Sequence, residues 1–473
     1  MKTKYKLSHY NLYLPVPDTE DILLYNTLYG GLAVITQDEN KILQELQKGF
    51  TFFIDNHVPD TEFIAKLIED KYVVKEDIDE PKLYKTVYLQ NIEQLFYRDA
   101  SKILITIATA NCCNMVCPYC YEVDKDKTIL NNRTNDQIIA FIKDILEKTP
   151  HITKWRNFFI SWYGGEPLLG KKAIEYLTPR LKSLAESYNM KYRADIVTNG
   201  LLLDAPTWKM LADNEVNDFQ ITIDGAQETH DKHRPLKNKK GENYHRILKN
   251  MSVMPQGISA TIRVNVDKKV AKNFSTFLND LTDYGIWPQN HKNVKIDLAW
   301  LRTYPEAGES DLEDRIKTFP EWVEIEAALK KLKINYYNEW AANNKQKPGK
   351  LRLRRLSPQF DDCHSMLSPH SFTIDANGYV YKCWEVVQDM KYMIQHVSEK
   401  YDPLKIYKLL NTTRFEVEKE CPNCQYRPVC GKTICQKREL YTCEEQKATI
   451  DSTLINDYLL HLSDPDKTVY VNI

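Results

Sequence analysis

The chain has 473 residues, too many for one ordinary hydrophobic core, so we expect two or three domains. Its 64 Lys and Arg residues balance 65 Asp and Glu residues, and this formal charge of -1 gives no overall field that favours nucleic acid or an anionic membrane. No apolar stretch is long enough to cross a bilayer and no signal peptide is present at the start, so we expect a cytoplasmic protein with neither partner.

The first predicted module covers residues 1–95. β-prone runs at residues 10–14, 22–26 and 32–36 indicate three short strands, joined by turns that contain Pro, Asp and the pair Gly30-Gly31. A helix is expected from Asp38, a second from Asp60 or Thr61, and residues 72–74 return as a strand. This order predicts a small winged-helix-like domain.

Two roles for this module stay open. An exposed strand edge beside a helix can capture an extended peptide as an added strand. The alternative is a structural cap on the next domain. DNA binding is disfavoured because the segment is not basic.

The next predicted domain covers residues 96–304 and alternates strands with helices. Amphipathic helical segments are expected at residues 138–146, 173–184 and 274–281. The β-rich runs are residues 103–107, 158–163, 194–197, 219–223, 260–264 and 294–298. This alternation predicts an α/β fold with a parallel sheet, and six units suit a partial (β/α)6 TIM barrel, whose reactive groups would lie beyond the carboxyl ends of the strands.

Three cysteines follow the first predicted strand with the spacing C-x3-C-x2-C: Cys113, Cys117 and Cys120. Three thiolates cannot complete the four-cysteine shell of a cubane iron–sulfur cluster, so one iron would stay open. The alternative is a zinc knuckle or a set of buried thiols. The neighbouring Cys112 is most simply a small buried apolar residue.

Further motifs fall after the next three strands. Gly164-Gly165-Glu166-Pro167 follows the second, where a glycine pair lets the backbone approach a ligand closely, although such a pair also makes ordinary turns. Thr198-Asn199-Gly200 follows the third and is also typical of a simple turn. Asp224 ends the fourth, where it can contact a ligand or cap the next turn, and His230 and Arg234 follow it.

Arg263 is a charge in the otherwise apolar fifth strand and needs a carboxylate partner. Glu166, the carboxylate of a bound cofactor, or a structural ion pair elsewhere in the barrel would each serve.

Residues 305–358 are predicted to link the barrel to the C-terminal region. Residues 321–340 have a helical pattern, and residues 345–355 contain six basic residues in eleven. A solvated linker face or a contact to an acidic stretch of a substrate would explain this basic run.

The last predicted domain, residues 359–473, holds seven of the eleven cysteines. Without a signal peptide, cysteines in such numbers favour metal binding over disulfides. A zinc ribbon would use four and leave three idle, whereas seven suit two clusters. The seven are Cys363, Cys383, Cys421, Cys424, Cys430, Cys435 and Cys443, and four residues separate Gly378 from the second.

The loop from Cys113 to Cys120 resembles the cluster loop of the radical S-adenosylmethionine (SAM) enzymes. The resemblance implies that the open iron of a [4Fe-4S] cluster binds SAM and that an electron from the cluster cleaves the cofactor to a deoxyadenosyl radical. It places the Tyr119 ring against adenine and Gly164, Gly165, Glu166 and Pro167 at the methionine amino group. The further implied cofactor contacts are Thr198, Asn199, Asp224 and Arg263.

The second cysteine group resembles the SPASM extension of these enzymes. The resemblance implies a first auxiliary [4Fe-4S] cluster on Cys363, Cys383 and Cys435, and a second on Cys421, Cys424, Cys430 and Cys443. Four residues separate Cys430 from Cys435 where the family has three, and the last gap is short, so Cys435 and Cys443 can exchange clusters. The fourth position of the first cluster would be open to a substrate thiolate, a backbone nitrogen or Cys112.

Together the motifs imply a radical SAM/SPASM peptide maturase with three [4Fe-4S] clusters. Such an enzyme abstracts hydrogen from a ribosomally made precursor peptide and forms a thioether or carbon–carbon cross-link. Residues 1–95 are similar to the leader-binding element of such enzymes, and a flavodoxin- or ferredoxin-type donor would supply electrons. The alternatives are an anaerobic sulfatase-maturating enzyme and, from another class, a zinc-binding regulator. The residues name no catalytic base.

Overall fold

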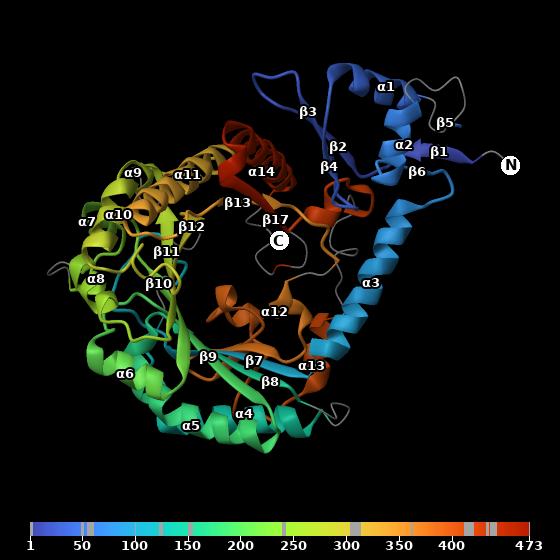
Figure 1. Ribbon diagram of the computed structural model, residues 1–473. Helices are drawn as coiled ribbons and strands as arrows, with labels where there is room; N and C mark the ends of the chain where they lie inside the picture. Colours follow the sequence, from blue (N-terminus) through green and yellow to red (C-terminus); the bar gives the residue numbers. More distant parts are fainter. Residues whose placement is uncertain are drawn as a thin grey trace.

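The structure is a computed structural model that describes residues 3–48, 52–53, 61–99, 101–122, 126–149, 155–238, 243–302, 314–360, 363–410, 421–431, 435 and 442–472. Figure 1 shows the barrel with its helices on the outside, the N-terminal module at the upper right, and the C-terminal region between them. The long helix α3 (Glu80–Asp99) runs from the N-terminal module along the edge of the molecule.

Six parallel strands form the barrel wall in the order β12-β11-β10-β9-β8-β7, which confirms the predicted partial barrel. The strands are β7 (Lys102–Ala110), β8 (Asn157–Gly164), β9 (Lys191–Thr198), β10 (Val216–Thr222), β11 (Ser259–Val266) and β12 (Val294–Trp300). The helices are α4 (Asn132–Glu147), α5 (Lys171–Ser187), α6 (Ala205–Asp213), α7 (Gln227–His233), α8 (Tyr244–Ser252), α9 (Lys268–Lys272), α10 (Phe274–Asp283) and α11 (Phe319–Asn343).

Apolar and polar residues alternate along the strands, and the apolar ones form the core. In β11 the apolar residues Ile262, Val264 and Val266 are fully buried and belong to the large cluster that joins the strands to the helices. Thr261, Arg263 and Asn265 alternate with them and are half-buried. Because successive side chains point to opposite faces, polar groups of β11 line the concave side of the sheet.

The sheet continues beyond the barrel into the second cysteine region, which the sequence did not predict. Strand β14 (Ser371–Ile374) pairs in parallel with β7, and β15 (Tyr379–Tyr381) and β16 (Gln395–His396) extend it in antiparallel fashion. The turn before β15 contains Gly378 with φ of 91°, a conformation that favours glycine. The short helices α12 (His364–Leu367) and α13 (Pro403–Leu410) flank this extension.

The predicted basic linker contains a strand. Residues of β13 (Leu351–Arg355) pair in parallel with β17 (Thr468–Asn472), near the end of the chain. The alternating sequence Leu-Arg-Leu-Arg-Arg explains this, because Leu351 and Leu353 are buried while Arg352 is exposed. Part of residues 305–358 is therefore a strand, while the side chains of Lys345, Lys347, Lys350 and Arg352 are exposed, as a solvated face predicts.

The N-terminal module has two small sheets and two short helices. Strands β2 (Asn11–Pro15), β3 (Ile22–Asn26) and β4 (Leu32–Ile35) lie at the three predicted positions, followed by α1 (Gln37–Lys48) and α2 (Thr61–Glu69). Asp60, the other predicted helix start, lies outside the described residues. The second sheet was not predicted as such and comprises β5 (Phe52–Phe53), β1 (Lys4–Leu7) and β6 (Val73–Lys75).

The β2-β3-β4 sheet is covered on both faces. Leu24 and Ile35 pack with residues of α1 and α2, whereas Leu23 on the opposite face packs with Leu454 of α14 (Cys443–Ser463) and with Val429. The hydroxyl of Tyr25 also donates to the Leu356 carbonyl at 2.9 Å. The module therefore shares a hydrophobic core with the C-terminal region.

In the described part of the chain, no helix combines the length and apolar character that a bilayer crossing requires.

The shared core makes a testable prediction on one helix. Leu454→Ala removes a side chain that is 2% exposed, and we expect it to lower the free energy of unfolding by about 2–5 kcal/mol. Leu462→Ala on the same helix is the control, because Leu462 is 47% exposed. Urea unfolding followed by circular dichroism measures both, and equal losses would show that α14 is not buried as described.

Candidate functional site

The site lies at the carboxyl ends of the barrel strands, where the loop of residues 111–122, here called the cluster loop, leaves β7. The loop is held first by the segment after α7. Met115 forms an antiparallel bridge with Leu236, the Val116 amide donates to the Pro235 carbonyl at 2.9 Å, and the Lys237 amide donates to the Asn114 carbonyl at 2.9 Å. A loop with three cysteines is thus fixed by backbone hydrogen bonds on one side.

The glycine pair after β8 holds the opposite side. The Gly165 amide donates to Ala110 and the Glu166 amide donates to Cys112, both at 3.0 Å. A Cβ at Gly165 would lie 2.4 Å from the Cys112 carbonyl oxygen, and Gly164 has φ of 126°. A Cβ at Gly164 would lie 2.2 Å from the Ala110 carbonyl oxygen, so Gly164 is required by the end of β7 and Gly165 by the cluster loop.

Glu166 joins the second and third motifs. Its carboxylate is fully buried and accepts hydrogen bonds from the Thr198 hydroxyl at 2.6 Å, the Asn199 amide at 2.8 Å and the Leu168 amide at 3.1 Å. Burial raises the pKa of Glu166, and the three donors act against that shift. The glycine motif and Thr198-Asn199-Gly200 thus form one unit.

Asn199 links this unit to the first cysteine. Its Nδ2 donates to Asn114 Oδ1 at 2.7 Å and lies 3.7 Å from Cys113 Sγ. Asn114 was not predicted as a site residue, although its place directly after Cys113 is the signal that could have identified it.

Asp224 anchors the third side of the site. Its carboxylate accepts hydrogen bonds from the Tyr119 hydroxyl and from the backbone and side-chain nitrogens of Asn265, the latter two at 3.0 and 3.1 Å. Arg234 NH1 donates to the same Tyr119 hydroxyl at 2.7 Å. Asp224 does not cap the next helix, because α7 begins after Ala226 without a side-chain cap.

Two buried histidines lie beside this network. His230 is fully buried and its Nδ1 accepts from the Asp224 amide at 3.1 Å, while burial, followed by the nearby Arg234, lowers its pKa well below the ordinary value. His233 lies 3.0 Å from the Asp267 carboxylate, and both are buried. A neutral imidazole at His230 keeps the Asp224 backbone in place.

The three thiols suit metal binding. Burial raises the pKa of Cys113 to about 12 and of Cys120 to about 11, and it also raises the pKa of Cys117. Buried thiols lose their protons when a metal replaces them. Among the described residues, no three His, Cys, Asp or Glu side chains are arranged to hold a single ion; the cysteines of a cubane each bind a different iron and need not converge on one point. The loop therefore fits an iron–sulfur cluster.

Arg263 does not pair with Glu166. Its NH1 lies 2.5 Å from Asp297 on β12, the residue opposite it in the parallel register. The side chains are 37% and 43% exposed, so this is a half-buried pair on the concave face. The alternative of a structural ion pair within the barrel is therefore what the structure contains.

In the second cysteine region, the thiols fall into two neighbourhoods. Burial raises the pKa of Cys383 to about 12, and Glu385, Cys363 and Cys435 are near enough to raise it further. Burial also raises the pKa of Cys421, and the nearby thiols of Cys430, Cys443 and Cys424 raise it further. These neighbours are the members of the two predicted ligand sets.

A buried lysine ties the first neighbourhood together. Lys382 is 1% exposed and its Nζ donates to the carbonyls of Ser368 and Ser371, at 2.6 and 2.8 Å. Burial lowers its pKa to about 7. These bonds fasten the strand that carries Cys383 to the segment that follows Cys363.

The N-terminal module contacts the second neighbourhood directly. His9 Nε2 lies 3.0 Å from the Asn423 carbonyl, Gln425 Nε2 donates to the His9 carbonyl at 3.0 Å, and Thr27 donates to the Gln425 carbonyl at 2.5 Å. Asn423 lies between Cys421 and Cys424. The first residues of the chain therefore help to shape a cysteine loop more than four hundred residues away in sequence.

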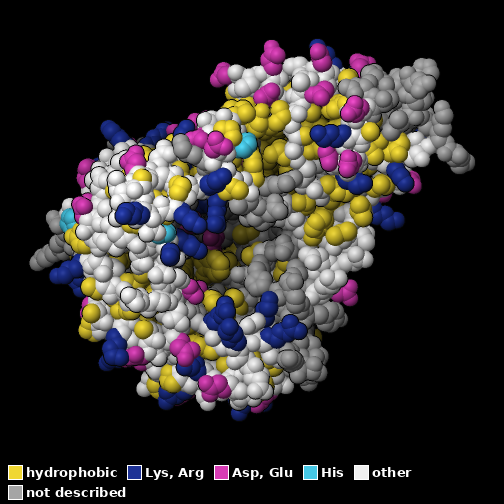
Figure 2. Space-filling view, viewed as in Figure 1, with side chains coloured by type: hydrophobic (Ala, Val, Ile, Leu, Met, Phe, Trp, Pro, Cys, Tyr) yellow, Lys and Arg dark blue, Asp and Glu magenta, His cyan; other side chains and the backbone are white. Residues whose placement is uncertain are grey.

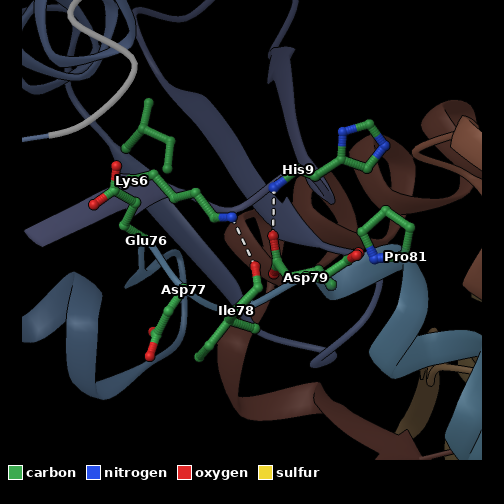
Figure 3. A pocket seen from close by; sticks show the side chains of 9 residues that line it. Lys6, His9, Glu76, Asp77, Ile78, Asp79 and Pro81 are labelled. Atoms are coloured by element: carbon green, nitrogen blue, oxygen red, sulfur yellow. Dashed lines mark hydrogen bonds between the residues drawn. The ribbon is translucent and has the colours of Figure 1, made fainter.

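His9 also lines a cavity of about 380 Å³ (Figure 3). Lys6 donates to the Ile78 carbonyl at 2.7 Å, and the His9 amide donates to the buried Glu80 carboxylate at 2.8 Å. The remaining lining includes Glu76, Asp77, Asp79 and Pro81. Figure 2 also shows a hollow near the centre of the visible face, with Lys and Arg side chains around it.

Comparisons with known proteins agree with this geometry. Residues 107–261 match the model of the Radical SAM superfamily. The chain is 26% identical over 362 residues to the cysteine-type anaerobic sulfatase-maturating enzyme of Clostridium novyi (strain NT), covering 71% of this chain and 88% of that protein. It is 24% identical over 207 residues to the radical SAM cyclopropyl synthase TigE of Paramaledivibacter caminithermalis, covering 39% of this chain and 42% of that protein.

The solved structure of native anSMEcpe with bound AdoMet and Cp18Cys peptide has the same fold. The TM-score is 0.53 at 15% identity, and the match covers 76% of this chain and 97% of that chain. The chain thus contains a radical SAM domain at residues 107–261, which implies SAM and a [4Fe-4S] cluster as cofactors, and it is an enzyme of the radical SAM type.

The packing of the glycine pair yields a prediction. In Gly165→Ala the new Cβ would meet the Cys112 carbonyl at 2.4 Å, so the cluster loop must shift. We expect reconstituted protein to lose the change that SAM induces in the electron paramagnetic resonance (EPR) signal of its cluster. Gly257→Ala is the control, since a Cβ at Gly257 would meet open space; its φ of 85° adds a backbone cost that Gly165 does not have, which makes the control the more demanding one. An unchanged signal in Gly165→Ala would contradict the described packing.

Proposed function

We propose that this radical SAM enzyme matures a ribosomally made peptide by forming a thioether or carbon–carbon cross-link. The observation that carries the proposal is the combination of a three-cysteine loop at the top of a partial barrel with a second cysteine region on the same sheet. A peptide is long enough to reach from an outlying module to the barrel, and the hollow in Figure 2 offers it a way in.

The cofactor site would use residues of all three motifs. Cys113, Cys117 and Cys120 would hold the cluster; Tyr119, Gly164, Gly165, Glu166, Pro167, Thr198, Asn199 and Asp224 are the proposed contacts for SAM. Arg263 pairs with Asp297 through NH1 and would contact SAM through its remaining guanidinium nitrogens. When bound, the cluster and SAM supply the radical that removes hydrogen from the substrate. Glu166 and Asp224 would act mainly by holding Asn199 and Tyr119 in place, because their carboxylates already accept hydrogen bonds from neighbouring residues.

The second cysteine region would carry electrons away from the substrate. We assign Cys363, Cys383 and Cys435 to the first auxiliary cluster, and Cys421, Cys424, Cys430 and Cys443 to the second. The mutual influence of these thiols on pKa supports both sets. A flavodoxin- or ferredoxin-type protein would supply the electron that starts each cycle.

The N-terminal module would bind the leader of the precursor. In the described residues β4 pairs only with β3, so its other edge is available for an added strand. The module is fixed to the C-terminal region through α14, and a bound leader would therefore hold the core peptide at a constant distance from the barrel.

A second candidate function is the maturation of sulfatases, in which a Cys or Ser becomes formylglycine. The match to the Clostridium novyi enzyme, over 88% of its length, favours this candidate. The two functions predict different products on the substrate.

The direct test is anaerobic incubation with SAM, reductant and the small peptide encoded beside the gene, followed by tandem mass spectrometry. We expect the loss of two hydrogens at one residue pair, and no product from Cys117→Ala. An aldehyde at Cys or Ser of a sulfatase-derived peptide, captured with a hydrazide, would support the second candidate. Neither product on either substrate would contradict both.

The leader proposal has its own test. Val34 on β4 is 47% exposed, and a lysine at the edge of a sheet disfavours strand addition. We expect Val34→Lys to weaken binding of a fluorescent leader peptide by about tenfold, or ~1.4 kcal/mol, in fluorescence anisotropy. Val253→Lys, at an equally exposed position on the barrel, should leave the affinity unchanged. Equal affinities for the two variants would place the leader elsewhere.

A further inference from the structure

Arg234 occupies a fixed position beside the cluster loop. Its amide donates to the His230 carbonyl at 2.8 Å, and its own carbonyl accepts from Asn243 Nδ2 at 2.7 Å. The next three residues, 235–237, pair with residues 114–116 of the cluster loop. The backbone that carries Arg234 therefore cannot move independently of the cysteines.

The guanidinium of Arg234 has few partners for a charge in the interior. Its NH1 donates to the Tyr119 hydroxyl, and no carboxylate of the described residues forms an ion pair with it. Asp224 is connected to it only through that hydroxyl. The Nε–H is buried and has no acceptor among the described residues. Arg234 is partly buried, and a charge withdrawn from water in this way is stabilised by a counter-charge, so the site favours a further anion.

The three cysteines are the neighbours that could provide this anion. Arg234 NH1 donates to the hydroxyl of Tyr119, the residue directly before Cys120, and the residues that follow Arg234 pair with the segment between Cys113 and Cys117. A cubane held by three thiolates carries net negative charge, and reduction increases it. Net charge and nearby hydrogen bonds are the main protein influences on the potential of such a cluster.

We propose that Arg234 is the built-in counter-charge of the SAM-binding cluster, and a positioning residue that holds Tyr119 beside it. The fixed cation raises the reduction potential of the cluster and so makes it easier to reduce. Glu166 and Asp224 have the opposite influence from the other sides of the site, and neutral His230 has little. This inference rests on the radical SAM domain and not on the identity of the substrate.

The test is an EPR-monitored redox titration of the reconstituted enzyme, in which the cluster of interest is identified by the change that SAM induces in its signal. We expect Arg234→Gln to shift the midpoint potential of that cluster to more negative values. Cleavage of SAM without substrate should slow by about tenfold or more at fixed reductant. Arg234→Lys keeps the charge and should keep the potential close to that of the unchanged enzyme.

Two further variants separate charge from structure. Tyr119→Phe removes the hydrogen bond to Arg234 but no charge, and its potential should stay close to the original value. Asp224→Asn removes a negative charge and should shift the potential to more positive values. If Arg234→Gln retains the cluster with an unchanged potential, the proposal is wrong. If Arg234→Gln cannot bind a cluster, the other two variants decide. An altered potential in Arg234→Lys would overturn the proposal, and so would an unaltered potential in Asp224→Asn.

Discussion

The active site depends on one buried carboxylate. Glu166 accepts hydrogen bonds from Thr198 and Asn199, and its own amide donates to the cluster loop at Cys112. The ends of β7, β8 and β9 are thereby fastened to one residue. Removing a partner of a buried, hydrogen-bonded charge is costly, so this constraint fixes the distance between the first cysteine and the third motif. Asn199, whose side chain lies 3.7 Å from Cys113 Sγ, takes its position from it.

The second cysteine region is held by elements from both ends of the chain. Residues 427–429 and α14 pack on the N-terminal sheet, while β14 extends the barrel through β7. The loops between Cys421 and Cys430 contain only single turns of helix. Because such loops have little regular structure of their own, these contacts between distant segments hold them in place. The N-terminal module is thus part of the cysteine region as well as a candidate peptide receptor.

Much of this arrangement could be predicted from local pattern. The parallel strands, the cysteine loop and the motifs at strand ends follow from periodicity and spacing. The partners of individual side chains do not. Arg263 pairs with Asp297 because the parallel register of β11 and β12 places them side by side, and a register is not encoded locally. Likewise, the pairing of β13 with β17 joins residues more than a hundred positions apart, so the strand within the basic run was not predicted.

The pairing of β14 with β7 has a consequence for electron transfer. The cluster loop leaves β7 in the interior of this continuous sheet, and β15, which adjoins β14, leads directly into Cys383. Tunnelling between redox centres falls off steeply with their separation, so any centres held at the two cysteine regions would keep a nearly constant rate of exchange while loops elsewhere fluctuate. A hinge between the regions would instead make that rate depend on domain motion.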